Sequence, residues 1–212
     1  MIFKNRGEAG RRLSQALEEY RGRRPLVLAV PRGGVVVAAP IVAALAGELD
    51  LIIPRKVGIP GNPELAAAAV MPDGTIIYNT KLMEALRIKP ADLQRLIWRE
   101  IDEIKRRMEV YRGGAVMPDI SGRVVIVVDD GIATGLTMEA ALRAVRKEKP
   151  GILVLAVPVA PPETAARLRG LVDDLICLAM PEPFYAVSQF YEDFGEVSDE
   201  EVKEIYSRYR PV

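Results

Sequence analysis

The chain has 212 residues, half of them hydrophobic, which is enough for one compact α/β domain with a sizeable core. Its 29 basic residues balance its 29 acidic residues, so net charge gives no general attraction to nucleic acids or acidic membranes, and neither is expected as a partner. Histidine is absent, which excludes Ser-His-Asp and Cys-His triads, His-ligated zinc and histidine acid–base catalysis. Any catalysis must use carboxylates, Lys, Arg, backbone amides or a bound metal.

The cysteine content and the first residues indicate the cellular compartment. Cys177 is the single cysteine, so no intrachain disulfide can form, and its apolar surroundings predict a small buried side chain. The first residues contain no apolar signal core, and no run approaches the roughly 18 apolar residues of a membrane span. We therefore expect a cytoplasmic protein.

Buried strands alternate with helices along most of the chain. Val, Ile and Leu runs predict strands at residues 26–30, 51–54, 75–78, 124–128, 152–158 and 175–178. Helices are predicted at residues 35–46, 136–147 and 163–169. Continuous apolar strands separated by helices are typical of a parallel sheet that is covered on both faces. The predicted fold class is therefore a doubly wound α/β domain with a mostly parallel sheet.

A helical insertion at about residues 80–113 interrupts this alternation, with helices predicted at 81–86 and 91–112. In the second helix, apolar residues recur at steps of four and three and form one seam: Ile97, Ile101, Ile104, Met108 and Tyr111. This seam either packs on the core of its own chain or forms a dimer contact.

The C-terminal segment, about residues 180–212, is predicted to form a small hood. Residues 184–194 are rich in aromatic side chains, which either join the core or stack on a planar base. A last helix is predicted at 198–209, because Ser198 is a good N-cap and Glu201 follows three residues later.

The most informative segment joins the strand at 124–128 to the next helix. Two adjacent carboxylates, Asp129 and Asp130, follow the strand, and ligands of open α/β sheets bind at the carboxyl ends of strands. Unpaired amides at the start of the helix suit a phosphate. The residues expected to bind it are Ala133, Thr134, Gly135, Leu136 and Thr137. The carboxylates would repel a phosphate but suit ribose hydroxyls or a hard cation, so the segment predicts a ribose 5-phosphate site.

Residues 125–137, Val-Ile-Val-Val-Asp-Asp-Gly-Ile-Ala-Thr-Gly-Leu-Thr, are similar to the phosphoribosyl diphosphate (PRPP) signature of type I phosphoribosyltransferases. Gly131 departs from the signature, because the family usually has an aliphatic residue there. A second match, Pro31-Arg32-Gly33-Gly34, looks like the diphosphate-binding loop of the family, with Arg32 as a cation at the strand end. The chain as a whole resembles a group of bacterial and archaeal phosphoribosyltransferases that are predicted from sequence.

The resemblance implies an activity and the residues that carry it. It implies Mg²⁺-dependent displacement of diphosphate from PRPP by a nitrogen acceptor, such as a nucleobase, and a homodimer. Residues 54–64 look like the mobile loop that closes over the site in this family, with Lys56 reaching the departing diphosphate. The expected catalytic residues are Arg32, Lys56, Asp129 and Asp130. These four, with Gly33, Gly34 and the phosphate-binding residues, are expected to bind PRPP, and the two aspartates to hold the metal, directly or through water or ribose hydroxyls.

The sequence says less about the acceptor and the type of reaction than about the PRPP site. Ala133 stands where family members that use 6-oxopurines carry a carboxylate, which argues against hypoxanthine or guanine. A non-catalytic PRPP or nucleotide sensor stays open, although the presence of Arg32 and Lys56 favours catalysis. A hydrolase that uses water as the acceptor also stays open. A dinucleotide-dependent oxidoreductase is excluded, because no Gly-x-Gly-x-x-Gly motif follows the first strand.

Overall fold

The computed structural model describes residues 2–59, 61–113 and 117–211, apart from the side chains of residues 63 and 64. Its frame is a five-stranded parallel sheet in the order β2-β1-β6-β7-β8. The strands are β1 (Leu26–Ala29), β2 (Glu48–Leu51), β6 (Val124–Val128), β7 (Ile152–Val159) and β8 (Asp174–Ala179). The predicted α/β fold is confirmed, although β2 begins and ends three residues earlier than the predicted strand 51–54.

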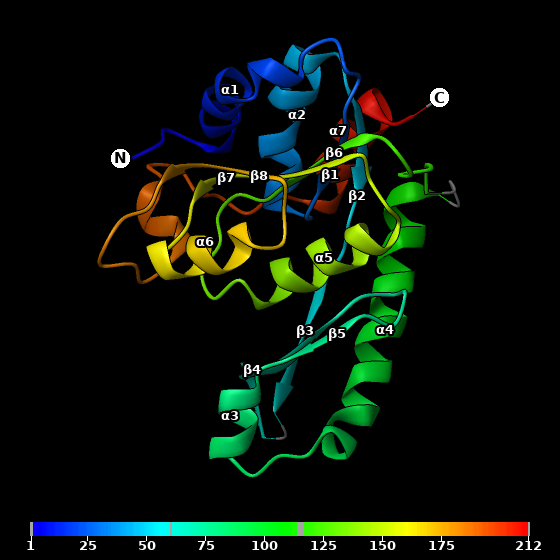
Figure 1. Ribbon diagram of the computed structural model, residues 1–212, viewed down its shortest axis with the longest axis vertical. Helices are drawn as coiled ribbons and strands as arrows, with labels where there is room; N and C mark the ends of the chain where they lie inside the picture. Colours follow the sequence, from blue (N-terminus) through cyan, green and yellow to red (C-terminus); the bar gives the residue numbers. More distant parts are fainter. Residues whose placement is uncertain (1, 60, 114–116, 212) are drawn as a thin grey trace.

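Helices cover both faces of this sheet (Figure 1). One face carries α1 (Arg6–Ala16), α2 (Gly33–Leu45) and α7 (Asp199–Tyr209), and the other carries α5 (Leu136–Lys147) and α6 (Pro162–Arg169). Two 3-10 turns complete these layers, η1 (Glu18–Tyr20) and η2 (Val187–Phe190). The sequence analysis missed α1, because its eleven residues are mostly polar and only one short stripe, including Ala9 and Leu13, is buried.

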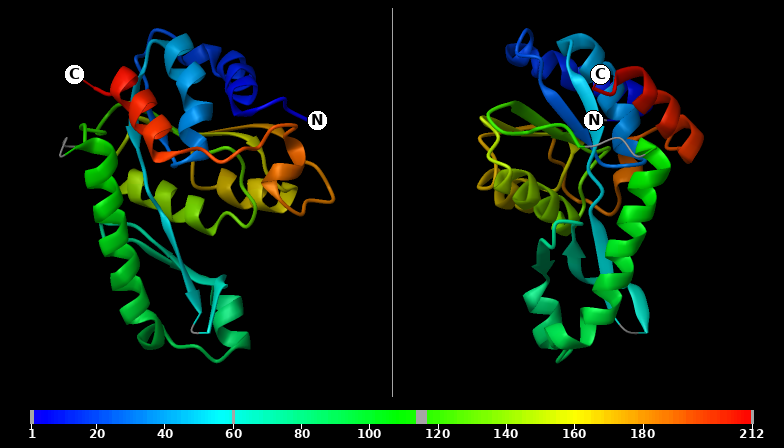
Figure 2. Two further views of the ribbon diagram at one scale, coloured as in Figure 1. Left: turned by 180° about the vertical axis from the view of Figure 1, so that it is seen from behind. Right: turned by 90° about the vertical axis from the view of Figure 1, so that its right-hand side faces the viewer.

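A second unit, which we call the arm, comprises residues 55–112 and extends away from the parallel sheet beyond α5 (Figures 1 and 2). It holds an antiparallel sheet in the order β3-β4-β5 and two helices. The elements are β3 (Arg55–Ile59), β4 (Asn62–Val70), β5 (Ile76–Tyr78), α3 (Thr80–Ala85) and α4 (Pro90–Arg112). The predicted helices of the insertion are present, but the insertion also contains a sheet that the sequence analysis did not predict.

Two predictions within the arm are therefore corrected. The strand expected at 75–78 belongs to the antiparallel sheet and not to the parallel one. The mobile loop expected at 54–64 is mostly strand, because β3 and β4 pair along most of their length; residue 60 lies outside the described residues. Ala66 to Ala69 give β4 little of the β-branched character that identifies a strand in sequence.

The apolar seam of α4 packs on the core of its own chain. Ile97, Ile101, Ile104 and Tyr111 are buried, and Met108 is partly buried against the same cluster. The core interpretation of the seam is thus confirmed, and a homodimer would need another surface. None of the helices in the described part of the chain has the length and apolar character that a membrane crossing requires.

The end of α4 is fixed to the parallel sheet by a buried ion pair. Arg112 Nε donates to Asp50 Oδ1 at 2.8 Å, and Arg112 Nη2 donates to Asp50 Oδ2 at 2.9 Å. Nη2 also donates to the Leu51 carbonyl at 2.8 Å. The exposed fractions of the two side chains are 8% for Arg112 and 0% for Asp50, so this junction between arm and sheet is shielded from water.

The C-terminal segment divides into two parts, so the predicted hood of 180–212 is too long. Helix α7 packs on α2, with Val202 and Tyr206 buried, and the Ser198 hydroxyl accepts a hydrogen bond from the Glu201 amide as predicted. Residues 180–195 fold instead with the N-terminal residues. Phe3 forms a parallel bridge with Tyr191, and its amide donates to the Phe190 carbonyl at 2.8 Å. We call residues 2–5 and 180–195 the hood.

Candidate active site

The two predicted motifs meet at one edge of the parallel sheet. Ala29 at the end of β1 is in register with Val128 at the end of β6, and the Val30 amide donates to the Val128 carbonyl at 2.9 Å. The loop with Arg32 therefore begins beside the strand end that carries Asp129 and Asp130. Strand pairing brings together segments that lie about a hundred residues apart in sequence.

Gly33 is the closest point of contact between these motifs. A Cβ atom at this position would lie 1.9 Å from Asp130 Oδ2 and 2.7 Å from Arg6 Nε. Any larger residue would displace the Asp130 carboxylate. The second glycine of the loop, Gly34, is buried at the start of α2.

The predicted phosphate loop precedes α5, which begins at Leu136 after Gly135 in a left-handed conformation. Helix α6 fixes the loop from the other side. The Thr164 hydroxyl donates to the Ala133 carbonyl at 2.9 Å, and Arg167 Nη2 donates to the Thr134 carbonyl at 2.5 Å. The carbonyls are thus held by α6, whereas the first amides of α5 have no acceptor within the helix. Such amides, with the positive end of the helix dipole, can bind a phosphate monoester.

Gly131, the departure from the family signature, has a structural explanation. Its φ is +156°, and a Cβ atom there would lie 2.5 Å from Val187 Cγ1 and 3.0 Å from Val159 Cγ1. In this chain Val187 of the hood fills the space that an aliphatic side chain at position 131 would need.

Arg32 lies in the predicted loop but pairs with Glu196, which precedes α7, and with Asp199, the first residue of α7. Its Nη2 is 2.6 Å from Glu196 Oε1, and its Nη1 is 3.8 Å from Asp199 Oδ1. Asp199 also accepts a hydrogen bond from the Tyr111 hydroxyl at 2.7 Å, which links this network to the end of α4. Glu196 is largely exposed, so an incoming anion can replace its carboxylate at the guanidinium.

Lys56 is placed differently from the other predicted residues. It lies on β3 of the arm, opposite Ala69, with an exposed side chain. The remaining predicted residues all lie at one edge of the parallel sheet. The structure thus brings together the acidic pair, the phosphate loop and the Arg32 loop, and assigns Lys56 to a separate unit.

The sequence analysis missed Arg6, which contacts the acidic pair from α1. Its Nε lies 2.7 Å from Asp130 Oδ2, and its Nη1 donates to the Gly195 carbonyl at 2.8 Å. The guanidinium carbon is 3.7 Å from the centre of the Phe194 ring, which is within the range of a cation–π contact. No local pattern could identify this residue, because 124 positions separate Arg6 from Asp130.

The hood supplies a second contact to the pair. The Tyr191 hydroxyl donates to the main-chain carbonyl of Asp130 at 2.6 Å, and burial, followed by the charge of Asp130, raises the pKa of Tyr191. Its hydroxyl therefore stays protonated as a donor. Phe190 and Tyr191 are buried in the hood, so these two aromatic side chains serve as its core.

Electrostatics at the pair favour a cationic or hydroxyl ligand. Burial and the neighbouring charge of Asp130 raise the pKa of Asp129 well above its ordinary value. The Asp130 amide donates to Asp129 Oδ1 at 2.8 Å, which offsets part of this cost. Within the described residues there is no group of three or more His, Cys, Asp or Glu side chains that could share a metal ion. A metal at this edge would therefore have only the two aspartates as carboxylate ligands.

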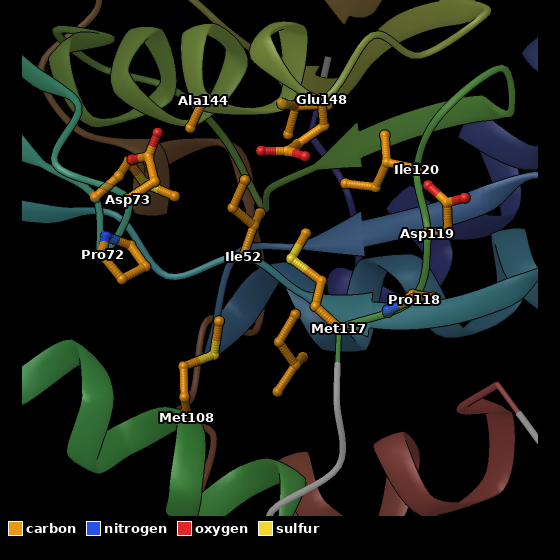
Figure 3. Close-up of a pocket in the computed structure, with 13 residues that line it drawn as sticks. Ile52, Pro72, Asp73, Met108, Met117, Pro118, Asp119, Ile120, Ala144 and Glu148 are labelled. Atoms are coloured by element: carbon orange, nitrogen blue, oxygen red, sulfur yellow. The ribbon is translucent and has the colours of Figure 1, made fainter.

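A separate apolar pocket of about 340 Å³ lies at the other end of α5 (Figure 3). Ala144 and Glu148 line it from the end of that helix, Met108 from α4, and Asp73 from the turn after β4. Asp73 is already paired with Lys147 at 3.0 Å. Helix α5 has 12 residues, so its two ends are about 18 Å apart. This pocket is not part of the site at the acidic pair.

A parallel sheet whose strand ends present an acidic pair, an arginine loop and a helix start with unpaired amides defines an α/β protein of the kind that binds ligands at the carboxyl ends of its strands. The sequence profile of the family described as "Phosphoribosyl transferase domain" matches residues 2–194. The chain therefore belongs to the phosphoribosyl transferase family, a family of pentosyltransferases, and the resemblance seen in the sequence is confirmed.

Relatives and solved structures agree with this assignment. A protein found in two Mycobacterium tuberculosis strains and named "Putative phosphoribosyl transferase" is 39% identical over 201 residues, which are 95% of this chain and 45% of that protein. The chain thus spans about half the length of this curated relative. A crystal structure of a protein from Thermus thermophilus is 43% identical, with a TM-score of 0.83 and full coverage of both chains.

A more distant neighbour shows the fold alone. It is a hypoxanthine-guanine phosphoribosyltransferase from Bacillus anthracis, crystallised with a HEPES molecule in its active site. The identity is 17% and the TM-score 0.50, with coverage of 87% of this chain and 82% of that one.

Proposed function

We propose that the chain is a Mg²⁺-dependent phosphoribosyltransferase that transfers the ribose 5-phosphate of PRPP to a nitrogen acceptor. The bond from ribose C1 to the diphosphate oxygen breaks, a bond from C1 to the nitrogen forms, and the nitrogen loses a proton. The observation that carries this proposal is the convergence of a phosphate loop, a carboxylate pair and an arginine loop at one sheet edge. These three parts match the 5-phosphate, the ribose hydroxyls and the diphosphate of a single substrate.

Each part has a distinct role in the proposed reaction. The amides from Ala133 to Thr137 hold the 5-phosphate, and this remote binding orients the reacting carbon. Asp129 and Asp130 accept hydrogen bonds from the ribose hydroxyls and stabilise positive charge on the sugar ring. Arg32 exchanges its acidic partners for the diphosphate, on which negative charge grows as the bond breaks.

The acidic pair also fits the proposed magnesium ion. Mg²⁺ is usually bound through one or two carboxylates together with water and substrate oxygens, which is what this edge offers. Asp129 and Asp130 would hold it, and it would supply neutralisation of the leaving diphosphate. The raised pKa of Asp129 shows that its ionised form is disfavoured by burial, a cost that a nearby cation would offset.

The acceptor is proposed to be a planar nitrogen compound other than a 6-oxopurine. Position 133 carries a methyl group, which cannot serve as a base, and the main-chain carbonyl of Ala133 is already used by Thr164. Most of the aromatic side chains of the hood are at least partly buried, but Tyr185 is 84% exposed and available to stack on a ring. Homodimerisation and a cytoplasmic location remain predictions that rest on the family resemblance and the sequence.

Calorimetric titration with PRPP and Mg²⁺ tests the binding step. We expect the double variant Asp129→Asn/Asp130→Asn to lose about 2–4 kcal/mol of binding free energy, because charged hydrogen-bond acceptors are removed. Asp119→Asn is the matched control, since Asp119 is exposed and accepts a hydrogen bond from the Ser121 amide. Equal binding by wild type and double variant would refute the role of the pair.

Turnover separates the enzyme from a non-catalytic sensor. PRPP and Mg²⁺ are incubated with a mixture of bases and amines, and the products are read by mass spectrometry. A new N-ribosyl 5-phosphate product supports transfer. Release of ribose 5-phosphate and diphosphate alone identifies a hydrolase, whereas binding without any product identifies a sensor.

A further inference from the structure

Arg6 forms an ion pair with Asp130 of the acidic pair, although Arg6 lies in neither of the two sequence motifs. Its Nε is 2.7 Å from Asp130 Oδ2, and only 11% of the Arg6 side chain and 16% of the Asp130 side chain are exposed. Because both groups are largely shielded from water, their charges interact more strongly than those of a surface pair. A positive charge is thus already present at the carboxylates that are proposed to contact ribose and magnesium.

Three further contacts hold the Arg6 guanidinium in place. It donates to the Gly195 carbonyl, lies against the Phe194 ring, and passes so close to Gly33 that a Cβ there would be 2.7 Å from Nε. The side chain is therefore fixed by the hood on one side and by the Arg32 loop on the other. Such a residue can hold the Asp130 carboxylate in one orientation.

We propose that Arg6 is the built-in counter-cation of the acidic pair and a positioning residue for Asp130. In the ligand-free protein it supplies the positive charge that two adjacent, largely buried carboxylates require. A divalent cation at the same oxygens is repelled by the guanidinium, so the pair binds Mg²⁺ weakly by itself. Asp129 and Asp130 would hold Mg²⁺ more strongly with PRPP bound, because the negative charges of PRPP offset that repulsion. The role of Arg6 in catalysis rests on the proposed function, whereas its effect on the metal affinity of the acidic pair does not.

Helix α1 provides a matched control for this proposal. Arg12 lies on the same helix, pairs with Glu8 at 2.6 Å and lies over the Phe3 ring at 5.5 Å. It therefore shares with Arg6 the residue type, the helix, a carboxylate partner and an aromatic contact. It differs in having no contact with the acidic pair.

The test is titration of the ligand-free protein with Mn²⁺, a paramagnetic substitute for Mg²⁺, followed by electron paramagnetic resonance. Arg6→Gln is expected to bind Mn²⁺ about tenfold more tightly than wild type, because one nearby positive charge is removed. Arg6→Lys, which keeps the charge, and Arg12→Gln are expected to match wild type. Thermal unfolding of each variant establishes that it is folded.

Two results would overturn the proposal. One is a folded Arg6→Gln variant whose Mn²⁺ affinity is equal to or weaker than that of wild type. The other is an Arg6→Lys variant that binds Mn²⁺ about tenfold more tightly than wild type, although it keeps the positive charge. If Arg6→Gln does not fold, Arg6→Met, which preserves the apolar contact with Phe194, replaces it in the same comparison. PRPP binding by wild type is measured separately, so failure of the proposed function is distinguishable from failure of the role of Arg6.

Discussion

The parallel sheet and the arm are stabilised in different ways. The central strands of the parallel sheet are buried on both faces, with Val27 and Ile126 facing one core cluster and Leu28 and Val127 facing the other. In the arm, β3 packs mainly on α4, whereas β4 and β5 contact α5 more than α4, and the outer surface carries ion pairs such as the one from Arg55 to Glu100. A doubly covered sheet fixes the groups at its edge, whereas the arm is held by its contacts with α5 and by the buried ion pair at its junction with that sheet. Changes at the junction and at the edge should therefore have different effects.

The largest effect is expected at the junction. Arg112→Ala leaves Asp50 buried without its cation, which should lower the free energy of unfolding by about 3–5 kcal/mol. Urea denaturation followed by circular dichroism measures this change. Arg107→Ala, which breaks a partly exposed pair with Glu103 on α4, is the control and should cost at most about 1 kcal/mol. Similar losses for the two variants would show that the junction has no special role.

The next largest effect is expected for PRPP affinity at the sheet edge that carries Asp130. Gly33→Ala places a methyl group where the Asp130 carboxylate lies, so we expect PRPP affinity to fall about a hundredfold through loss of charged hydrogen bonds. Calorimetry measures the affinity. Gly7→Ala on α1 is the control, because its Cβ would come no nearer than 3.4 Å to another group and its PRPP affinity should equal that of wild type. Unchanged PRPP affinity in Gly33→Ala would mean that the carboxylate can move without cost.

A smaller effect tests whether the arm takes part in catalysis. Lys56→Ala is expected to lower kcat about tenfold and to change PRPP affinity by less than about threefold, if the arm contacts the diphosphate only as it leaves. Steady-state kinetics with PRPP and an accepted base separate the two quantities. Lys105→Ala, at an exposed position on α4, should leave both unchanged. Equal kcat values for Lys56→Ala and wild type would restrict the chemistry to the parallel sheet.

The smallest effect concerns the carboxylate that pairs with Arg32. Glu196→Gln removes an exposed partner of the guanidinium, so PRPP should bind about two- to threefold more tightly at low salt, because exposed pairs contribute less than about 1 kcal/mol. The gain should shrink as salt screens the pair. Glu192→Gln serves as the control on the same segment. Weaker PRPP binding by Glu196→Gln would show that Glu196 helps to place Arg32 for the substrate.

The two units also differ in how far they could be predicted. Strands buried on both faces appear as continuous apolar runs, so 124–128 was located without error. In the arm, β4 consists largely of alanine and is identified only by its partners β3 and β5. Antiparallel pairing across a turn depends on cross-strand contacts, which no single segment encodes. Lys56 was accordingly predicted in a loop and lies on a strand.

The sequence by itself determined the parallel sheet, the acidic pair, the phosphate loop and the arginine loop, because each is a local pattern of apolar periodicity or of adjacent functional groups. Only the tertiary structure decided which distant residues complete the site. Arg6, Tyr191 and Arg167 reach it through packing of α1, the hood and α6, and their sequence surroundings carry no sign of that contact. The physical reason is that a charge partner is selected by distance in space, which the chain fixes only when its layers pack together.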